Sequence, residues 1–294
     1  SDAGGIGIIQ PMSMRFVHQH KVGDGIRYIR RLTDKPVGFN AIVEKTNRVF
    51  EDQMRGWIDT ALEEGVRFFV TALGNPDWVV KKVHAVNGIV YHDITERKWA
   101  QKALDSGVDG LICVNGRAGG HAGQKDPRIL FDELRDLDVP LICAGGIGDE
   151  QRFIEALETG YAGVQMGTRF IASEQCNAHH DYKAAIVRAQ AEDIVHTEKI
   201  SGVPVAVINT PYIEKTGTKA GRIGKRLLMH PRWKRHMRLL YSLKSVWQLR
   251  KASMQGMHYK DYFQAGKSVS GIKKVESAAD IVERFAKAAK EAQI

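Results

Sequence analysis

The chain has 294 residues, of which 43% are hydrophobic, so it is long enough to bury one large core. Its three cysteines, Cys113, Cys143 and Cys176, have neither paired nor zinc-type spacing, which argues against a disulfide framework and a structural metal site. No apolar run approaches the roughly 20 residues that span a bilayer, and no signal-peptide pattern opens the chain. We therefore expect a cytoplasmic protein with no membrane partner.

The formal net charge of +9 is concentrated in one segment. Between Lys215 and Lys251 there are 12 Lys and Arg and no Asp or Glu, so the rest of the chain has a net charge of −3. Such a basic segment binds nucleic acid, an anionic carrier or a membrane surface, or forms a solvated helical face. We adopt the solvated face as the interpretation, so no nucleic-acid partner is expected.

Short runs rich in Val, Ile and Phe alternate along the chain with segments whose apolar residues recur at helical spacing. Apolar strands that alternate with helices form parallel sheets covered by those helices. The predicted strands are Gly5–Gln10, Val37–Val43, Arg67–Leu73, Ile89–Ile94, Gly110–Asn115, Pro140–Ala144 and Ala162–Met166. The helices predicted between them include Val49–Glu64, Glu96–Ser106, Pro127–Leu137 and Glu150–Thr159.

This alternation predicts an α/β fold of the (β/α)8 TIM barrel class, which needs eight strands. The sequence contains seven β/α units. Its opening residues, Ser1–Gly5, resemble the tail of a helix that runs into a strand, so we expect the first strand to precede Ser1. An open doubly wound sheet is the alternative architecture.

The alternation stops after Phe170. Two more helices are predicted, over Asn177–Gln190 and Ala278–Ala292, with a glycine-containing stretch at Tyr262–Ile272. Residues 1–190 and 260–294 are therefore predicted to form the barrel. Residues 191–259 are predicted to form a basic, mainly helical insertion or cap on it.

Glycine-rich turns follow two consecutive predicted strands, one at Ala144–Gly146 and the next at Gly167–Thr168. Small residues let backbone N–H groups approach an anion closely. The last two strands of this barrel class carry the usual phosphate site in the loops that follow them. The two turns together predict a phosphate-binding site.

A histidine lies between glycines in the predicted loop Gly119–Gly123. Small neighbours allow a planar ligand to approach, and an imidazole near neutral pH takes or gives a proton. A surface histidine on a flexible loop is the alternative reading. Beside the predicted phosphate site, we interpret His121 as the candidate catalytic residue.

Five motifs in combination closely resemble the nitronate monooxygenases, formerly called 2-nitropropane dioxygenases. The resemblance extends over roughly Ser1 to Cys176, and a weaker resemblance is found at Tyr262–Ile272. The motifs are Asp2–Gly7, Asp34–Asn40, Ala118–Gly123, Ala144–Gly146 and Met166–Phe170.

The resemblance implies an FMN-dependent oxidoreductase that oxidises alkyl nitronates, with O2 reoxidising the flavin and His121 acting as acid or base near the flavin ring. It also implies that the turns at Gly145–Gly146 and Gly167–Thr168 hold the FMN phosphate. The further cofactor-binding residues implied are Asn40, Asn75, Gly119, Gly120, Ala144, Gln264, Gly266 and Lys267.

One departure from the family concerns His92–Ile94, because many members carry a lysine near the flavin pyrimidine at this place. A carboxylate there disfavours an anionic reduced flavin. Either Asp93 points away from the flavin or the redox chemistry differs.

Two related enzymes share these motifs. A flavin-dependent enoyl-acyl-carrier-protein reductase uses NAD(P)H, and the basic segment suits an acidic carrier protein. An NAD(P)H:quinone reductase is the second relative. A different class of protein, an RNA-binding module on a barrel scaffold, leaves the phosphate turns and His121 unexplained.

The sequence leaves open the electron donor and the oligomeric state, and a homodimer is one possible state.

Overall fold

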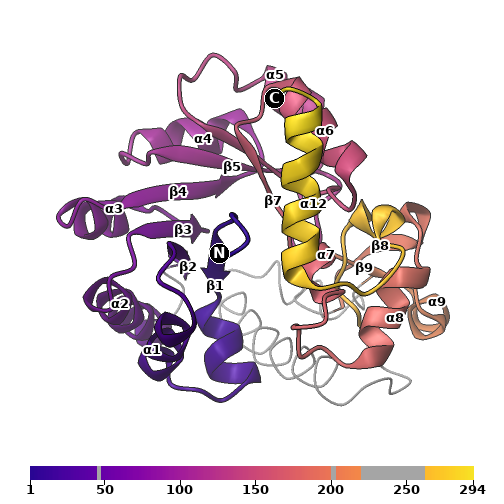
Figure 1. Cartoon of the computed structure of the whole chain (residues 1–294), viewed down its shortest axis with the longest axis horizontal. Helices are drawn as coiled ribbons and strands as arrows, with labels where there is room; N and C mark the ends of the chain where they lie inside the picture. The colour runs from indigo at the N-terminus through magenta and orange to yellow at the C-terminus, as the bar shows by residue number, and fades with distance from the viewer. Residues whose placement is uncertain (45–47, 200–202, 220–261) are drawn as a thin grey trace.

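The computed structural model of the chain describes residues 1–44, 48–199, 203–219 and 262–294. Within them, seven strands form one parallel sheet in the order β1 to β7 (Figure 1). The sheet curls into a partly open barrel, with β1 and β7 at its two edges. The strands are β1 Gly7–Ile9, β2 Val37–Ile42, β3 Phe68–Ala72, β4 Ile89–Ile94, β5 Gly110–Val114, β6 Leu141–Ala144 and β7 Gly163–Gln165.

Helices follow the strands and cover the outside of the sheet (Figure 1). They are the π-helix η1 Ser13–Val17 and α1 Val22–Leu32, α2 Arg48–Glu63, α3 Asp77–His84, α4 Arg97–Leu104, α5 Pro127–Asp132, α6 Glu150–Thr159 and α7 Thr168–Ile171. Helix α8 His180–Arg188 instead packs in a separate apolar cluster with later parts of the chain. The later elements are η2 Ala191–Asp193, α9 Pro211–Thr216, η3 Lys267–Gly271 and α12 Ala278–Glu291.

Local sequence explains how α6 begins and ends. At its start, the side chain of Asp149 accepts a hydrogen bond from the backbone N–H of Arg152 at 2.9 Å, which satisfies one of the helix's free donors. At its end, Gly160 takes the left-handed conformation with φ of 113°. These caps fix the two ends of α6, and the N-terminal cap also ends the loop that follows β6.

The two faces of the sheet bury different residues. The face toward the helices carries the main core, which includes Phe39 and Phe69 with their ring centroids 5.7 Å apart. The inner face of the barrel carries a smaller apolar cluster centred on Val70, Ile112 and Ala144. Side chains alternate between the faces along each strand, so the inner face is identified by these three residues.

The C-terminal part of the chain packs back onto the barrel. Helix α12 lies beside α6 (Figure 1), where the rings of Phe153 and Phe285 meet edge to face at 5.2 Å. A two-stranded antiparallel sheet of β8 Ile194–Thr197 and β9 Val205–Ile208 lies beside the loop after β5, because Ala206 donates to the carbonyl oxygen of Gly120 at 2.8 Å.

The seven predicted strands are confirmed, and Ile89–Ile94 and Glu150–Thr159 have the predicted bounds. Helices α1 and α3 are consistent with the seven predicted β/α units, but no bounds were predicted for them. The β8–β9 hairpin lies at the start of the segment predicted to be mainly helical. Most of the basic segment Lys215–Lys251 falls outside the described residues. Among the described helices, none is both long and apolar enough to cross a membrane.

A core substitution tests this packing. Ile58 in α2 is fully buried, whereas Ile129 in α5 is 56% exposed. Replacing Ile58 by alanine should lower the free energy of unfolding by about 2–5 kcal/mol, because the cavity adds to the lost transfer energy. Ile129→Ala, the matched control, should change it by less than about 0.5 kcal/mol. Urea unfolding measures both, and equal losses would contradict the assigned core.

Candidate functional site

Three loops and one returning segment meet at the carboxyl end of the sheet. The loops follow β5, β6 and β7, and the returning segment is 262–271. Thr168 accepts a hydrogen bond from the backbone N–H of Gly266 at 3.0 Å, and Lys267 donates its backbone N–H to the carbonyl oxygen of Arg117 at 2.9 Å. The structure thereby brings residues from both regions of the resemblance into one cluster.

Gly119 and Gly266 lie against each other. A Cβ atom added to Gly266 would lie 2.5 Å from the backbone nitrogen of Gly119, and one added to Gly119 would lie 3.0 Å from the backbone nitrogen of Gly266. Real Cβ atoms essentially never come within 2.5 Å of backbone, so the packing of the two chain segments needs glycine at position 266, while a Cβ atom at position 119 would make a tight contact. A contact of either residue with flavin stays a prediction.

The turn after β6 is fixed by a buried asparagine. Gly145 and Gly146 have φ of 120° and 86°, which favours glycine at both positions. Asn115, which is fully buried, donates from Nδ2 to the carbonyl oxygen of Gly145 at 3.0 Å, and its Oδ1 accepts from the N–H of Arg117 at 2.8 Å. Ala144 precedes the turn, and its carbonyl oxygen accepts a hydrogen bond from the backbone N–H of Asn115 at 3.0 Å.

Asn115 was not singled out from the sequence. The signal that was available is a polar residue at the end of an apolar strand, directly before a glycine. An amide at such a place bonds to backbone groups of neighbouring loops. Its side chain joins the loop after β5 to the turn after β6, so it positions the site.

The surroundings of Gly167 and Gly120 differ from those of the packed glycines. A Cβ atom at either position would meet no atom within 4 Å among the described residues. Gly120 has φ of 66°, whereas Gly167 has φ of −111°, which any residue adopts. The packing of the chain therefore does not explain the glycine at position 167, and the open space beside it is available to a ligand.

The two candidate asparagines have different environments. Asn40 pairs in register with Val70 and so lies on the inner face of the barrel, where its Oδ1 is buried with no hydrogen-bond partner in the described structure. Asn75 is exposed, and its Oδ1 accepts from the N–H of Asp77 at 2.8 Å and from Ser106 at 3.1 Å. The carbonyl of Asn75 is thus engaged at the start of α3, and a flavin contact for this residue stays a prediction.

His121 follows the left-handed Gly120 at the tip of the loop after β5. His121 is an exposed residue, yet nearby protein atoms desolvate its ring enough to lower its pKa below the usual value, and the negative charge of Glu44 partly opposes this. Because the ordinary pKa is already near 6.5, the neutral imidazole dominates at pH 7. A neutral imidazole is able to accept a proton.

Gln264 and Lys267 lie on the returning segment. The carbonyl oxygen of Gln264 accepts a hydrogen bond from the hydroxyl of Tyr182, and the residue forms a β-bridge with Val207. The side chain of Lys267 is exposed. These contacts hold the backbone beside Gly119, while a flavin contact of the two side chains stays a prediction.

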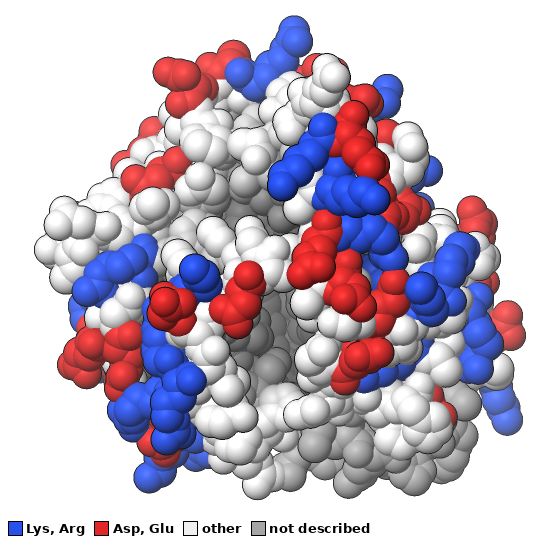
Figure 2. Space-filling model, viewed as in Figure 1, with Lys and Arg blue, Asp and Glu red and all other residues white. Residues whose placement is uncertain are grey.

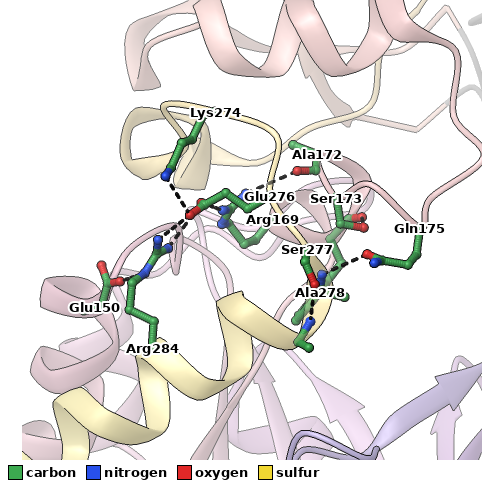
Figure 3. A network of polar contacts seen from close by, with 12 residues as sticks. Glu150, Arg169, Ala172, Ser173, Gln175, Lys274, Glu276, Ser277, Ala278 and Arg284 are labelled. Atoms are coloured by element: carbon green, nitrogen blue, oxygen red, sulfur yellow. Dashed lines mark hydrogen bonds and ion pairs between the residues drawn. The ribbon is translucent and has the colours of Figure 1, made fainter.

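A buried ion-pair network anchors the returning segment (Figure 3). Arg169, which follows the turn after β7 and is 1% exposed, pairs with Glu276. Glu276 also pairs with Arg284 at 2.5 Å and with Lys274 at 3.4 Å, and Arg284 reaches Glu150 at the start of α6. The carboxylate of Glu276 thus joins the turn after β7 to α12.

Two cavities border this region. One of about 330 Å³ lies on the helix side of the turn after β6, and its lining includes Gly146 and the side chains of Arg117 and Arg152. The other, of about 670 Å³, lies beside the edge strand β1 and is lined mainly by apolar surface. Figure 2 shows a hollow on this face beside α12, whose ridge carries Lys, Arg, Asp and Glu side by side.

Fold and loops together define a partly open parallel α/β barrel with glycine-rich turns after its last two strands. The family model described as nitronate monooxygenase matches residues 1–287. The chain belongs to the nitronate monooxygenase family, as its motifs indicated.

Similar proteins carry more than one name. A relative from Rhodococcus jostii, named (3aS,4S,5R,7aS)-5-hydroxy-7a-methyl-1-oxo-octahydro-1H-indene-4-carboxyl-CoA dehydrogenase, is 29% identical over 76% of this chain. A probable nitronate monooxygenase from Staphylococcus saprophyticus is 28% identical over 73% of this chain and 72% of its own length. The chain spans 62% of the length of the Rhodococcus relative.

Solved structures share the fold. FabK from Thermotoga maritima superposes with a TM-score of 0.79 and 28% identity, covering 100% of this chain and 87% of that one. A nitroalkane oxidase from Streptomyces ansochromogenes superposes with a TM-score of 0.72 over 99% of this chain and 90% of that one. At 18% identity, the second likeness concerns the fold alone.

The network of Figure 3 generates a stability prediction. Replacing Glu276 by glutamine leaves the buried guanidinium of Arg169 without its carboxylate, so the free energy of unfolding should fall by about 3–5 kcal/mol. The control is Asp136→Asn, which breaks the exposed pair with Arg97 and should leave the free energy of unfolding nearly unchanged, because solvent screens an exposed pair. Urea unfolding of both variants measures the difference. Losses of the same size would show that burial does not increase the contribution of the Glu276 pair to the free energy of unfolding.

Proposed function

We propose that this protein is a flavin-dependent oxidoreductase that binds FMN at the carboxyl end of its barrel. The proposal is supported by membership of the nitronate monooxygenase family and by the two glycine turns that lie side by side after β6 and β7. The single observation that carries it is the open space at Gly167, which the packing of the chain does not explain.

The residues present fit this cofactor. The space at Gly167 would accept the FMN phosphate, with backbone N–H groups of the turns after β6 and β7 as donors. On the inner face of β2, the buried and unpartnered Oδ1 of Asn40 would accept a hydrogen bond from the flavin ring. A ring with polar edges can form hydrogen bonds with polar atoms that have no partner on an otherwise apolar wall.

His121 is the residue that we propose moves a proton. FMN, when bound, supplies two-electron oxidation and reduction. The neutral imidazole, kept so by its lowered pKa, takes a proton from the substrate or returns one to it, and Glu44 stabilises the imidazolium form. The loops after β5 and β6 and the segment at Gly266 position this side chain.

We propose alkyl nitronates as the substrate, with O2 as the final oxidant. The family match and the Staphylococcus relative support this choice. NAD(P)H as an electron donor, and a homodimer, remain proposals for the same fold.

A second candidate substrate is an acyl thioester. The relative from Rhodococcus is named as a dehydrogenase of a carboxyl-CoA compound, and its identity to this chain is similar to that of the Staphylococcus relative. An enoyl thioester on a carrier protein belongs to the same chemical class, and a quinone is a further acceptor. Reduction of an enoyl thioester or of a quinone differs from nitronate oxidation in needing NAD(P)H to reduce the flavin.

A glycine substitution tests the cofactor. Gly167→Ala introduces a methyl group into the proposed phosphate space without backbone strain, so the protein should keep its unfolding midpoint but bind FMN about tenfold more weakly or worse, the value of one charge-assisted hydrogen bond. The control Gly56→Ala, also open but in α2, should leave FMN affinity unchanged. Flavin fluorescence measures binding. Unchanged affinity in Gly167→Ala would mean that the phosphate lies elsewhere.

Anaerobic mixing tests the reaction. A nitronate should bleach the bound flavin of the wild type, and air should restore its colour. His121→Ala should keep the flavin but bleach about a hundredfold to ten-thousandfold more slowly, the usual contribution of a positioned acid or base. Bleaching by NADH or NADPH but not by a nitronate, followed by reoxidation with an enoyl thioester, would favour the thioester candidate instead.

A further inference from the structure

A second carboxyl group faces the inside of the barrel. Asp93 lies on β4 and pairs in register with Ile112 of β5, which belongs to the inner apolar cluster. Its neighbours along β4, His92 and Ile94, are buried on the other face. Asp93 therefore points inward and does not turn away from the space that the sequence resemblance assigns to the flavin.

The carboxyl group of Asp93 lacks a partner. Its Oδ1 is buried and makes no hydrogen bond in the described structure, as is true of Oδ1 of Asn40 two strands away. Both atoms lie on the wall formed by β2, β3 and β4, while the proposed phosphate turns follow β6 and β7. A buried polar atom without a partner costs free energy, so two of them on one wall indicate a ligand with polar edges.

The surroundings of Asp93 are apolar. The inner face of β3 contributes Val70, and that of β5 contributes Ile112. On β4 itself the nearest inward group is Tyr91, whose own pKa is raised, so it is a neutral phenol at pH 7. Burial raises the pKa of Asp93 to about 7, and among the described residues no charged group adds to or opposes this rise.

This position has a chemical consequence. An ionised carboxylate in an apolar wall is costly, whereas the protonated acid is neutral and carries an O–H donor. Below pH 7 the acid form dominates in Asp93. A neutral acid does not repel a reduced flavin that bears negative charge, so the aspartate is compatible with flavin chemistry at a place where a lysine is common in the family.

We propose that Asp93 presents a neutral carboxyl group to the flavin ring and holds the ring by donating a hydrogen bond to one of its acceptor atoms. The assignment rests on the proposed binding of FMN. Asp93 acts here as a positioning residue, since it holds the ring and takes no part in moving the substrate proton.

The pH dependence follows by linkage. If FMN binds the protonated form, its dissociation constant is constant well below pH 7 and rises as Asp93 ionises in the free protein. Between pH 6 and pH 8 the rise is about tenfold. Titration of FMN itself affects every variant alike, so it cancels when each variant is compared with the wild type.

The test measures the dissociation constant of FMN at pH 6 and pH 8, by dilution of the holoprotein and flavin fluorescence. Asp93→Asn carries an N–H donor that does not titrate, so we expect it to bind like the wild type at pH 6 and about tenfold more tightly than the wild type at pH 8. Asp93→Leu has no donor and should bind more weakly than the wild type at pH 6, with no further loss at pH 8 relative to Asp93→Asn. The exposed Asp105→Asn is the control and should follow the wild type at both pH values.

Two outcomes would overturn the assignment, and they are distinguishable. If FMN binds but the ratio of wild type to Asp93→Asn is the same at both pH values, or if Asp93→Leu binds as tightly as the wild type at pH 6, the role of Asp93 is wrong while the proposed function stands. If neither the wild type nor Asp105→Asn binds FMN at either pH, the proposed function fails, and the role of Asp93 fails with it.

Discussion

The buried guanidinium of Arg169 is the constraint on which the arrangement of the site depends. A charge in an apolar interior needs a carboxylate beside it, and here Glu276 supplies that carboxylate from 107 residues further along the chain. The pair fixes the returning segment beside the turn after β7. Gly266 is thereby brought against Gly119, at a separation that only glycine allows.

The two faces of the barrel sheet differ in whether their buried polar groups have hydrogen-bond partners. On the helix side, within the main core, the buried polar side chains of Thr71 and His92 pair with each other at 2.8 Å. The inner face carries the unpartnered oxygens of Asn40 and Asp93 toward the carboxyl end of the sheet. Loops position the groups that react, while the scaffold holds them in place.

Sequence reasoning set bounds for the elements with strong periodicity and set none for helices α1 and α3. The strands have near-continuous apolar runs, so all seven were found, whereas α1 contains Gly23 and Gly25 and buries only Val22 and Ile26. Helix α3 follows Asn75 and Pro76, which read as loop residues after a strand. The apolar run Val205–Ile208 was a signal for a strand, but the basic charge of the segment after it favoured a helical interpretation.

The sequence by itself determined the parallel α/β alternation, the seven strands and the glycine turns, because each depends on residues close together in the chain. The tertiary structure decided which glycines pack against backbone and which leave space, since a Cβ clash depends on a partner far along the chain. It also gave different hydrogen-bonding environments to Asn40 and Asn75, which had been predicted for the same role. The side-chain carbonyl of Asn75 accepts from the nearby backbone N–H of Asp77, whereas Asn40 has no such local donor on its strand and keeps a buried oxygen without a partner in the described structure.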